Sequence, residues 1–290
     1  MIRDIGYMTI LKTAPGTSVQ DQGRMEFGAF GVPRAGIMDQ RSFDWVNHLL
    51  KNKKTAAVLE ILQPGLKIQF DTPTLICLAG AKATVNLNGE SIPSFGLVQI
   101  RADDLIEIGA FDKGAVFYIG IKNGFQTEQV MSSRSWFAGI TNVGFANKGD
   151  QIPYFTTQEV PAFTASKVRY DFAWQSQKVI EVYPGPEWKL LDKKTQELIE
   201  SEEFTISELK NRMAIQLLEL LPNELPQMAT APVFPGTVQL TSGGKIIILM
   251  KDGQVTGGYP RILHLMDESL AILAQKNSRD KIRFKLKWLI

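Results

Sequence analysis

The chain has 290 residues, 44% hydrophobic and 21% charged, a balance typical of a soluble globular protein of about two domains. Its 32 Lys and Arg against 30 Asp and Glu give a net charge of +2, which argues against nucleic acid, since nucleic-acid binders usually carry a basic excess. A single cysteine, Cys77, and two separated histidines, His48 and His264, exclude an internal disulfide and a metal site of the usual zinc spacing.

Several common segments and motifs are absent from the sequence. No apolar run approaches the roughly 18 residues that span a bilayer, and the N-terminus lacks a signal-peptide pattern. We therefore expect a cytoplasmic protein without a membrane partner. The sequence contains neither a G-x-S-x-G elbow nor a dinucleotide-binding fingerprint. A phosphate loop is also absent, because Gly243-Gly244-Lys245 is followed by isoleucine where that motif needs serine or threonine.

The first half of the chain reads as one helix followed by short strands. Asp39 is placed to cap a helix over residues 40–50. Cys77 lies in an apolar run and is expected to be a buried strand residue, and Asn88-Gly89 is a hairpin signal. Alternating or apolar patterns predict strands over 66–70, 84–87, 97–101, 105–108 and 116–121.

The second half continues in the same style. It follows a segment without clear periodicity over 140–175, which we expect to be either a domain junction or a long excursion of the chain. Helices are predicted over 187–200, with Trp188, Leu191 and Leu198 buried, over 207–210, and over 267–276. Strands are predicted over 179–183, 237–240, 246–250 and 282–288. The predicted class is mainly β, a barrel or sandwich with a few short covering helices.

Three segments carry candidate functional residues. The first runs from Gly16 through Asp21 and Arg24 to Asp39 and is rich in glycine and mixed charge; the alternative is a plain loop with an Asp21–Arg24 pair and Asp39 as a helix cap only. The second, residues 252–261, has a threonine and two glycines that can present N–H groups to an anion, or it is a hairpin turn. The third contains Arg212, which taken alone is more typical of a structural ion pair.

These segments resemble the biotin-dependent carboxyltransferase-like family, which includes the C-type subunit of ATP-hydrolysing 5-oxoprolinase, also known as allophanate hydrolase subunit 2. The resemblance is carried in order by GTSVQDQGR, GVPRAGIMD, NHLLKN, AAVLEI, ICLAGAKATVNLNG, SSRSW, VYPGPEW, NRM, VFPGTVQL, IIILMKDGQVTGGYPRI and DKIRF. It runs from about residue 8 to about residue 288. Ala35 and Val255 stand where the family usually has hydroxyl residues, and Glu26 where it often has glycine.

The resemblance implies two cyclophilin-like β-barrel subdomains, which we place at residues 1–175 and 176–290. It implies work with a B-like and an A-like subunit that together open the lactam 5-oxoproline with ATP hydrolysis. ATP is expected in the complex, at a site that the sequence does not locate. No covalent biotin is expected, because Met250-Lys251-Asp252 lacks the second methionine of a biotin-attachment motif.

The resemblance also supplies candidate site residues. A carboxylate could orient or deprotonate an amide nitrogen, an arginine could bind a substrate carboxylate, and backbone amides could stabilise an oxyanion. The expected catalytic residues are Asp21, Arg24, Asp252 and Thr256. The expected substrate-binding residues are Gln20, Gly23, Met38, Asp39, Arg134, Arg212, Gln239, Gly257, Gly258 and Tyr259.

Two other functions remain open at this point. One relative antagonises a B-like inhibitor of a histidine kinase, so the chain is alternatively a regulatory binding protein with a vestigial pocket. A third reading is a carboxyltransferase-type domain acting on urea-like substrates.

Overall fold

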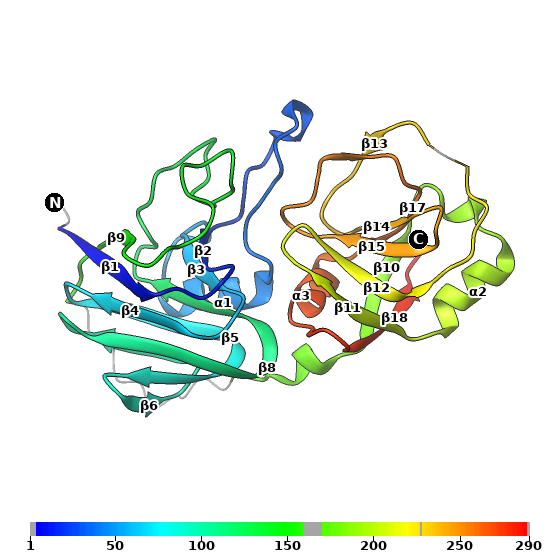
Figure 1. Ribbon diagram of the computed structural model, residues 1–290. Coiled ribbons are helices and arrows are strands. Elements are labelled where there is room, and N and C mark those ends of the chain that lie inside the picture. Colours follow the sequence, from blue (N-terminus) through cyan, green and yellow to red (C-terminus); the bar gives the residue numbers. More distant parts are fainter. Residues whose placement is uncertain (1–3, 159–169, 227, 289–290) are drawn as a thin grey trace. The chain divides into compact units, whose positions relative to one another are not determined.

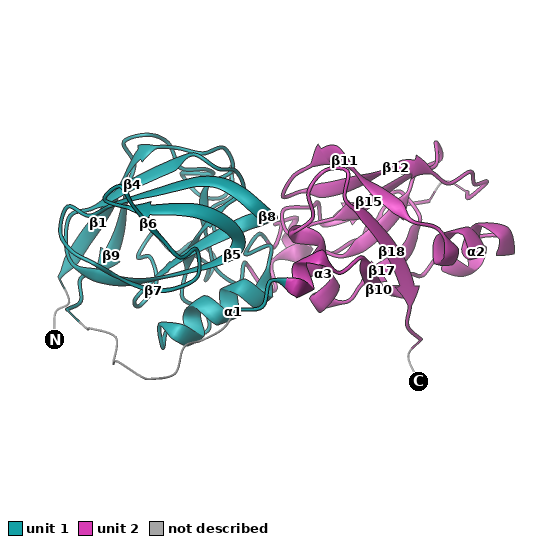
Figure 2. Cartoon of the chain, turned by 90° about the horizontal axis from the view of Figure 1, so that it is seen from below, with its two compact units in different colours: residues 1–23, 35–172 teal, residues 24–34, 173–290 magenta. Residues whose placement is uncertain are grey.

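The computed structural model describes residues 4–158, 170–226 and 228–288, and these fold as mainly β structure (Figure 1). Two compact units are present (Figure 2). Unit 1 comprises Met1–Gly23 and Ala35–Phe172, and unit 2 comprises Arg24–Arg34 and Ala173–Ile290. The predicted fold class, mainly β with two β subdomains and few helices, is confirmed. The unpatterned segment 140–175 lies partly outside the described residues.

Unit 1 is built on two long paired strands, β5 (Thr74–Leu87) and β8 (Leu105–Ile121). They run antiparallel from the pair Ile76–Ile121 to the pair Leu87–Ile106. The sheet continues in the order β2 (Ser18–Gln20), β3 (Val58–Ile61), β8, β4 (Leu66–Phe70), β1 (Ile5–Lys12) and β9 (Gln151–Phe155). The short strands β6 (Glu90–Ile92) and β7 (Gly96–Ile100) pair with β5.

The core of unit 1 consists of apolar side chains from these strands. The buried residue Cys77 lies in β5, as predicted, and burial raises the pKa of its thiol to about 12. The predicted strands 105–108 and 116–121 are parts of the one strand β8, and 84–87 is the end of β5. The Asn88-Gly89 turn is confirmed, with φ of 52° and 85° joining β5 to β6.

One helix, α1 (Gln40–Leu49), packs against the β5–β8 pair. The predicted cap is confirmed, because the Asp39 carboxylate accepts the Ser42 N–H at 3.0 Å. Gly120 of β8 lies directly beneath the helix, where an added Cβ would come within 1.9 Å of Val46 Cγ1. The absence of a side chain at Gly120 therefore sets how closely α1 approaches the sheet.

Unit 2 contains a closed barrel of seven strands. The parallel pair β10–β18 closes it, while the other neighbouring strands are antiparallel. Its order is β10 (Val179–Pro184), β17 (Arg261–Leu265), β14 (Thr237–Leu240), β15 (Lys245–Leu249), β12 (Ala214–Leu220), β11 (Phe204–Lys210) and β18 (Lys281–Leu286). In β18, Ile282 and Phe284 are buried while Lys281, Arg283 and Lys285 are exposed, as the alternation predicts.

The helices of unit 2 partly match the sequence pattern. The predicted helix after Asp267 is α3 (Asp267–Ala274). The predicted helix 187–200 divides into a 3-10 turn, Trp188–Leu190, and α2 (Lys193–Ser201), because Asp192 caps a new helix by accepting the Thr195 N–H. Trp188 and Leu191 are buried as expected, but Leu198 is only half-buried and Ile199 takes the buried position.

The predicted short helix 207–210 is wrong, because these residues belong to β11. That strand pairs with β12 through Ile206–Leu217 and Lys210–Ile215, and with β18 through Phe204–Ile282. Pairing with strands distant in the sequence outweighs the weak helical spacing of four residues.

Candidate functional site

Asp21 follows β2, and its carboxylate accepts four hydrogen bonds within unit 1. Its Oδ1 accepts the hydroxyls of Ser133 and Ser135 at 2.6 and 2.7 Å and the Gly23 N–H at 2.8 Å. Its Oδ2 accepts the Arg134 N–H at 2.6 Å. The side chain is buried, so the carboxylate is fixed in orientation and joins two loops of the unit.

Gln20 lies one residue before Asp21 and is fully buried. Its amide nitrogen donates to Ser18 Oγ at 2.9 Å and to the Trp136 carbonyl at 3.1 Å, and its amide oxygen accepts the Gly36 N–H at 3.1 Å. Both ends of the amide are therefore used inside the unit. Gln20 holds the loop that carries Asp21, and its side chain is not presented to a ligand.

The backbone at Met38 and Asp39 is held from below by two buried polar side chains. The Glu60 carboxylate accepts the Met38 N–H and the Tyr118 hydroxyl, both at 2.7 Å. The Tyr118 oxygen in turn accepts the Asp39 N–H at 2.9 Å. Burial, and then the nearby carboxylates of Glu60 and Asp39, raise the pKa of Tyr118 well above its ordinary value of 10. The tyrosine is a neutral donor here.

A polar cavity of about 550 Å³ adjoins Asp21 and Arg134 in unit 1. The Arg134 guanidinium points a nitrogen at the Gln126 side-chain oxygen, at 3.4 Å. Gln126 is itself fixed by donating to the carbonyls of Asn123 and Gly124 at 3.0 and 2.7 Å. The lining residues are Asp21, Lys51, Asn52, Lys53, Thr55, Ala56, Ala57, Asn123, Phe125, Gln126, Gln129, Ser132, Arg134 and Phe155.

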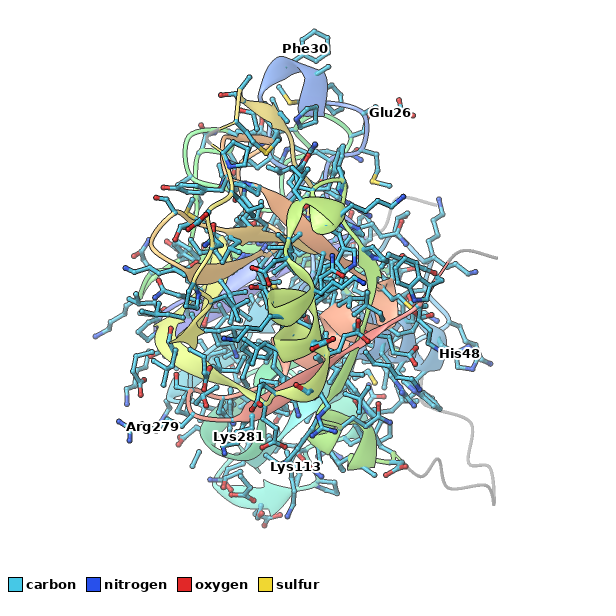
Figure 3. All side chains as sticks on the ribbon, turned by 90° about the vertical axis from the view of Figure 1, so that its right-hand side faces the viewer. Glu26, Phe30, His48, Lys113, Arg279 and Lys281 are labelled. Carbon is cyan, nitrogen blue, oxygen red and sulfur yellow. The ribbon has the colours of Figure 1, made fainter. Side chains whose placement is uncertain are left out.

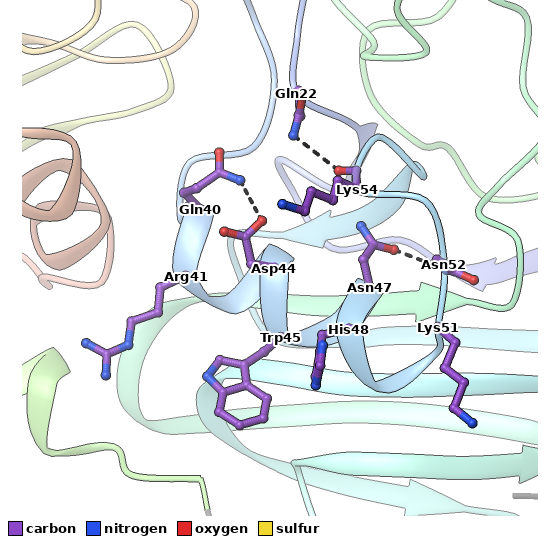
Figure 4. A pocket seen from close by; sticks show the side chains of 10 residues that line it. All are labelled: Gln22, Gln40, Arg41, Asp44, Trp45, Asn47, His48, Lys51, Asn52 and Lys54. Carbon is purple, nitrogen blue, oxygen red and sulfur yellow. Dashed lines mark hydrogen bonds between the residues drawn. The ribbon is translucent and has the colours of Figure 1, made fainter.

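A second, larger hollow of about 890 Å³ follows the outer face of α1 (Figure 4). Lys51 and Asn52, at the end of the helix, line both cavities. Of the sequence-predicted site residues, none lines this hollow. Its lining residues are Gln22, Gln40, Arg41, Asp44, Trp45, Asn47, His48, Lys51, Asn52 and Lys54.

In unit 2, Arg212 and Asp252 form a two-pronged ion pair. Arg212 Nε donates to one carboxylate oxygen and Nη2 to the other, both at 2.8 Å. The side chains are 4% and 10% exposed, and the Asp252 N–H also donates to the Arg212 carbonyl at 2.8 Å. The two-pronged contact that the sequence suggested for an arginine and a substrate carboxylate is made here with Asp252, so the pair joins two turns.

The Thr256–Tyr259 segment lies near the buried Gln239. Thr256 and Gly257 form β16 (Thr256–Gly257), which pairs with β13 (Ala231–Pro232). The Gln239 amide donates to the Tyr259 carbonyl at 3.4 Å, and a Cβ on Gly257 would lie 2.6 Å from that amide nitrogen. Glycine at 257 thus permits close approach of the two strands, while Thr256, Gly258 and Tyr259 are exposed.

Arg24 belongs to the segment Arg24–Arg34 of unit 2 and is buried. Its N–H donates to the Arg34 carbonyl at 2.7 Å, which closes the segment into a loop. Phe30 lies at the tip of this loop and is 80% exposed (Figure 3).

The predicted site residues are divided between the two units. Gln20, Asp21, Gly23, Met38, Asp39 and Arg134 lie in unit 1, and Arg24, Arg212, Gln239, Asp252, Thr256, Gly257, Gly258 and Tyr259 lie in unit 2. Sequence reasoning missed Glu60, Tyr118, Ser133 and Ser135. The two serines flank Arg134 in the SSRSW motif, which was a usable signal, whereas Glu60 and Tyr118 stand in apolar strands that look like plain core.

No helix in the described part of the chain is long and apolar enough to cross a bilayer. Within the same residues, no three His, Cys, Asp or Glu side chains gather in a way that could hold a metal ion.

Curated relatives match nearly the whole chain. It is 28% identical to the C subunit of the 5-oxoprolinase of Haemophilus influenzae over 95% of this chain and 90% of the relative, and 27% identical to that of Escherichia coli over 92% and 87%. It is also 27% identical to a urea amidolyase of Lachancea kluyveri, over 94% of this chain but 16% of the relative.

Solved structures share the fold. The urea amidolyase of Kluyveromyces lactis superposes with a TM-score of 0.83 and 22% identity over 96% of this chain and 18% of that one. The urea carboxylase of the same yeast gives 0.82 and 23% over 96% and 27%. The family model described as carboxyltransferase domain, subdomain A and B, matches residues 30–286. The chain thus belongs to the carboxyltransferase domain family.

Proposed function

We propose that the chain is the C-type subunit of an ATP-dependent 5-oxoprolinase that opens a small lactam or amide together with A-like and B-like subunits. The observation that carries the proposal is coverage: the chain aligns over 90% of the C subunit of a 5-oxoprolinase but over only 16% of a urea amidolyase. The match thus takes in nearly all of the first relative and a small part of the second, which supports the first assignment.

The chemistry available in unit 1 supports a role in handling a polar substrate. The fixed Asp21 carboxylate and the Arg134 guanidinium line one cavity, together with amide side chains. Lys251, the lysine of the incomplete biotin-attachment pattern, is only 8% exposed, which agrees with a chain that carries no covalent biotin because an attached lysine must reach a ligase.

The decisive experiment is co-expression of this chain with A-like and B-like partners from neighbouring genes, followed by an assay of ATP-dependent glutamate release from 5-oxoproline. We expect turnover only when all three chains are present. A complex that forms but releases no glutamate, with or without ATP, would contradict the proposal.

A second candidate, a non-catalytic protein that binds a B-like kinase inhibitor, is favoured by one observation. Asp21 and Asp252, two of the expected catalytic groups, are each engaged in hydrogen bonds that hold loops together. For such a protein, tight association with the B-like chain would persist while 5-oxoproline and urea both fail as substrates. Turnover of urea or a related amide with a carboxybiotin donor would instead identify a carboxyltransferase.

A further inference from the structure

Helix α1 ends in a motif whose key position usually belongs to glycine. The Asn52 N–H donates to the Asn47 carbonyl at 2.8 Å and the Lys51 N–H to the His48 carbonyl at 3.0 Å, the two hydrogen bonds of a Schellman ending. Lys51 occupies the left-handed position of this ending, with φ of 51°. A lysine at this position carries backbone strain that glycine would avoid. We therefore expect the lysine side chain to serve a role that glycine could not.

The same cavity collects two more residues of this kind. Ser132 and Asn123, which also line it, have φ of 62° and 67°. Asparagine tolerates this conformation, but serine and lysine rarely adopt it. Strained backbone of this sort clusters at ligand sites, because the surrounding structure holds it for a purpose other than stability.

The charges of the cavity are unbalanced. Lys51, Lys53 and Arg134 contribute three cations, and Asp21 is the one acidic residue of the lining. Both oxygens of Asp21 already accept hydrogen bonds from Gly23 and the 133–135 segment. Across the residues that the structure describes, neither lysine forms an ion pair, and the Arg134 side chain has one hydrogen bond, the long contact to Gln126. Three cations are thus available to an incoming anion.

We propose that this cavity of unit 1 binds a carboxylate or phosphate group through Arg134, Lys51 and Lys53, with Gln126 as a positioning residue that aims the guanidinium. The proposal rests on the proposed function, for which it names the part of the substrate that is recognised: the carboxylate of a lactam such as 5-oxoproline, or a phosphate of ATP. An arginine fork matches either group in two-pronged geometry, and the lysines add point charge.

The test is a binding titration of the full chain by calorimetry with three probes: 5-oxoproline, its carboxylate-free analogue 2-pyrrolidinone, and inorganic phosphate. We expect 2-pyrrolidinone not to bind and at least one of the two anions to bind. Binding of 5-oxoproline alone identifies a carboxylate site, and binding of phosphate identifies a nucleotide phosphate site. Arg134→Gln and Lys53→Gln should each lower the affinity for the anion by about tenfold or more. Lys148 is an exposed lysine outside the cavity, and Lys148→Gln should leave the affinity unchanged.

Lys51→Gly separates a ligand role from a structural one. It removes the cation and relieves the left-handed backbone, so the thermal midpoint should stay level or rise while the affinity for the anion falls. Gln126→Leu should lower affinity less than Arg134→Gln, and Gln126→Glu should retain part of it. Equal binding of 5-oxoproline and 2-pyrrolidinone, no binding of either anion, or affinities that ignore all of these substitutions would overturn the proposal.

The outcome is distinguishable from that of the proposed function. If the chain binds an anion through Arg134 but its complex never releases glutamate, the anion site is supported and the 5-oxoprolinase assignment is contradicted. If Arg134→Gln and Lys53→Gln leave glutamate release unchanged, the 5-oxoprolinase assignment is supported and the anion site is contradicted.

Discussion

Asp21 concentrates four hydrogen bonds on one buried carboxylate, which makes it a structural residue whatever its chemistry. We predict that Asp21→Ala lowers the free energy of unfolding by on the order of 3 kcal/mol, because the donors lose a charged acceptor while they stay buried. Asp21→Asn should cost less, since one oxygen remains. Urea unfolding measures both, with the exposed Asp112→Asn as a control that should stay within about 0.5 kcal/mol.

These variants also separate support from catalysis. If Asp21 acts only on the fold, the turnover of the assembled complex should follow the folded fraction of each variant. A folded Asp21→Asn chain without turnover would give the carboxylate a chemical role.

The Arg212–Asp252 pair is a second residue-scale prediction. Removing one partner leaves a buried charge without its counterpart, so Arg212→Met and Asp252→Leu should each destabilise the chain by about 3–5 kcal/mol. The double variant Arg212→Met, Asp252→Leu should recover much of that loss, because no charge is then left buried. A double-mutant cycle in urea measures the coupling, and purely additive losses would show that the pair is not a unit.

For single residues, the sequence predicted which residues belong to the candidate site better than it predicted the groups that they contact. Asp21, Asp39, Arg212 and Asp252 were singled out, but the groups they contact were not. Asp39 is a helix cap, as the alternative interpretation expected, and Arg212 is in an ion pair, as a lone arginine usually is. Ser133 and Ser135 lie more than 110 positions from Asp21, and no local pattern encodes a contact across that separation.

Among the elements, the seating of α1 on β8 depends on Gly120. An added Cβ would meet Val46 Cγ1 at 1.9 Å and Leu50 Cδ1 at 3.1 Å, so the helix must shift. We predict that Gly120→Ala lowers the free energy of unfolding by about 1–3 kcal/mol through overpacking. Val46→Ala in the same chain should restore part of the loss by making room; a double variant no more stable than Gly120→Ala would refute the overpacking explanation.

The turn after β10 is tied to β17 by Glu187 and Arg261. Burial raises the pKa of Glu187, but hydrogen bonds and charge from Arg261, at 2.9 and 3.0 Å, outweigh it and hold that pKa below its usual 4.5. A lowered carboxyl pKa stabilises the fold above the unfolded value and loses that contribution as pH falls through the folded one. The difference in the free energy of unfolding between the wild type and Glu187→Gln should therefore be constant above about pH 5 and become smaller below pH 4.5. Urea unfolding from pH 7 to pH 3 measures it, and a gap independent of pH would refute it.

Elements with strong periodicity were predictable, and elements decided by distant pairing were not. The alternation in β4 and β18 and the cap of α1 are local signals, and all three appear as expected. The segment 207–210 has no strong local preference and becomes a strand because it continues β11, whose first residues pair with β18 and whose Lys210 pairs with Ile215 of β12. Lys51 is a signal that could have been found, since a helix ending without glycine at its left-handed position is unusual.

For the whole molecule, composition and strand pattern predicted the class, and motif order predicted the family. The parallel pair β10–β18, which closes the unit 2 barrel, joins residues about a hundred positions apart, and no periodicity in the sequence predicts this pairing. The grouping of Arg24–Arg34 with unit 2 is equally non-local, because that loop precedes most of unit 1 in the chain.

This interleaving has a consequence for synthesis on the ribosome. Residues 24–34 emerge well before residue 173, where the rest of unit 2 begins. At roughly 5–20 residues per second, that interval is on the order of ten seconds. The loop Arg24–Arg34 is therefore made while unit 1 is still being synthesised and before the rest of unit 2 exists. Phe30 at its tip, which is 80% exposed even in the folded chain, is accessible to chaperones throughout that interval.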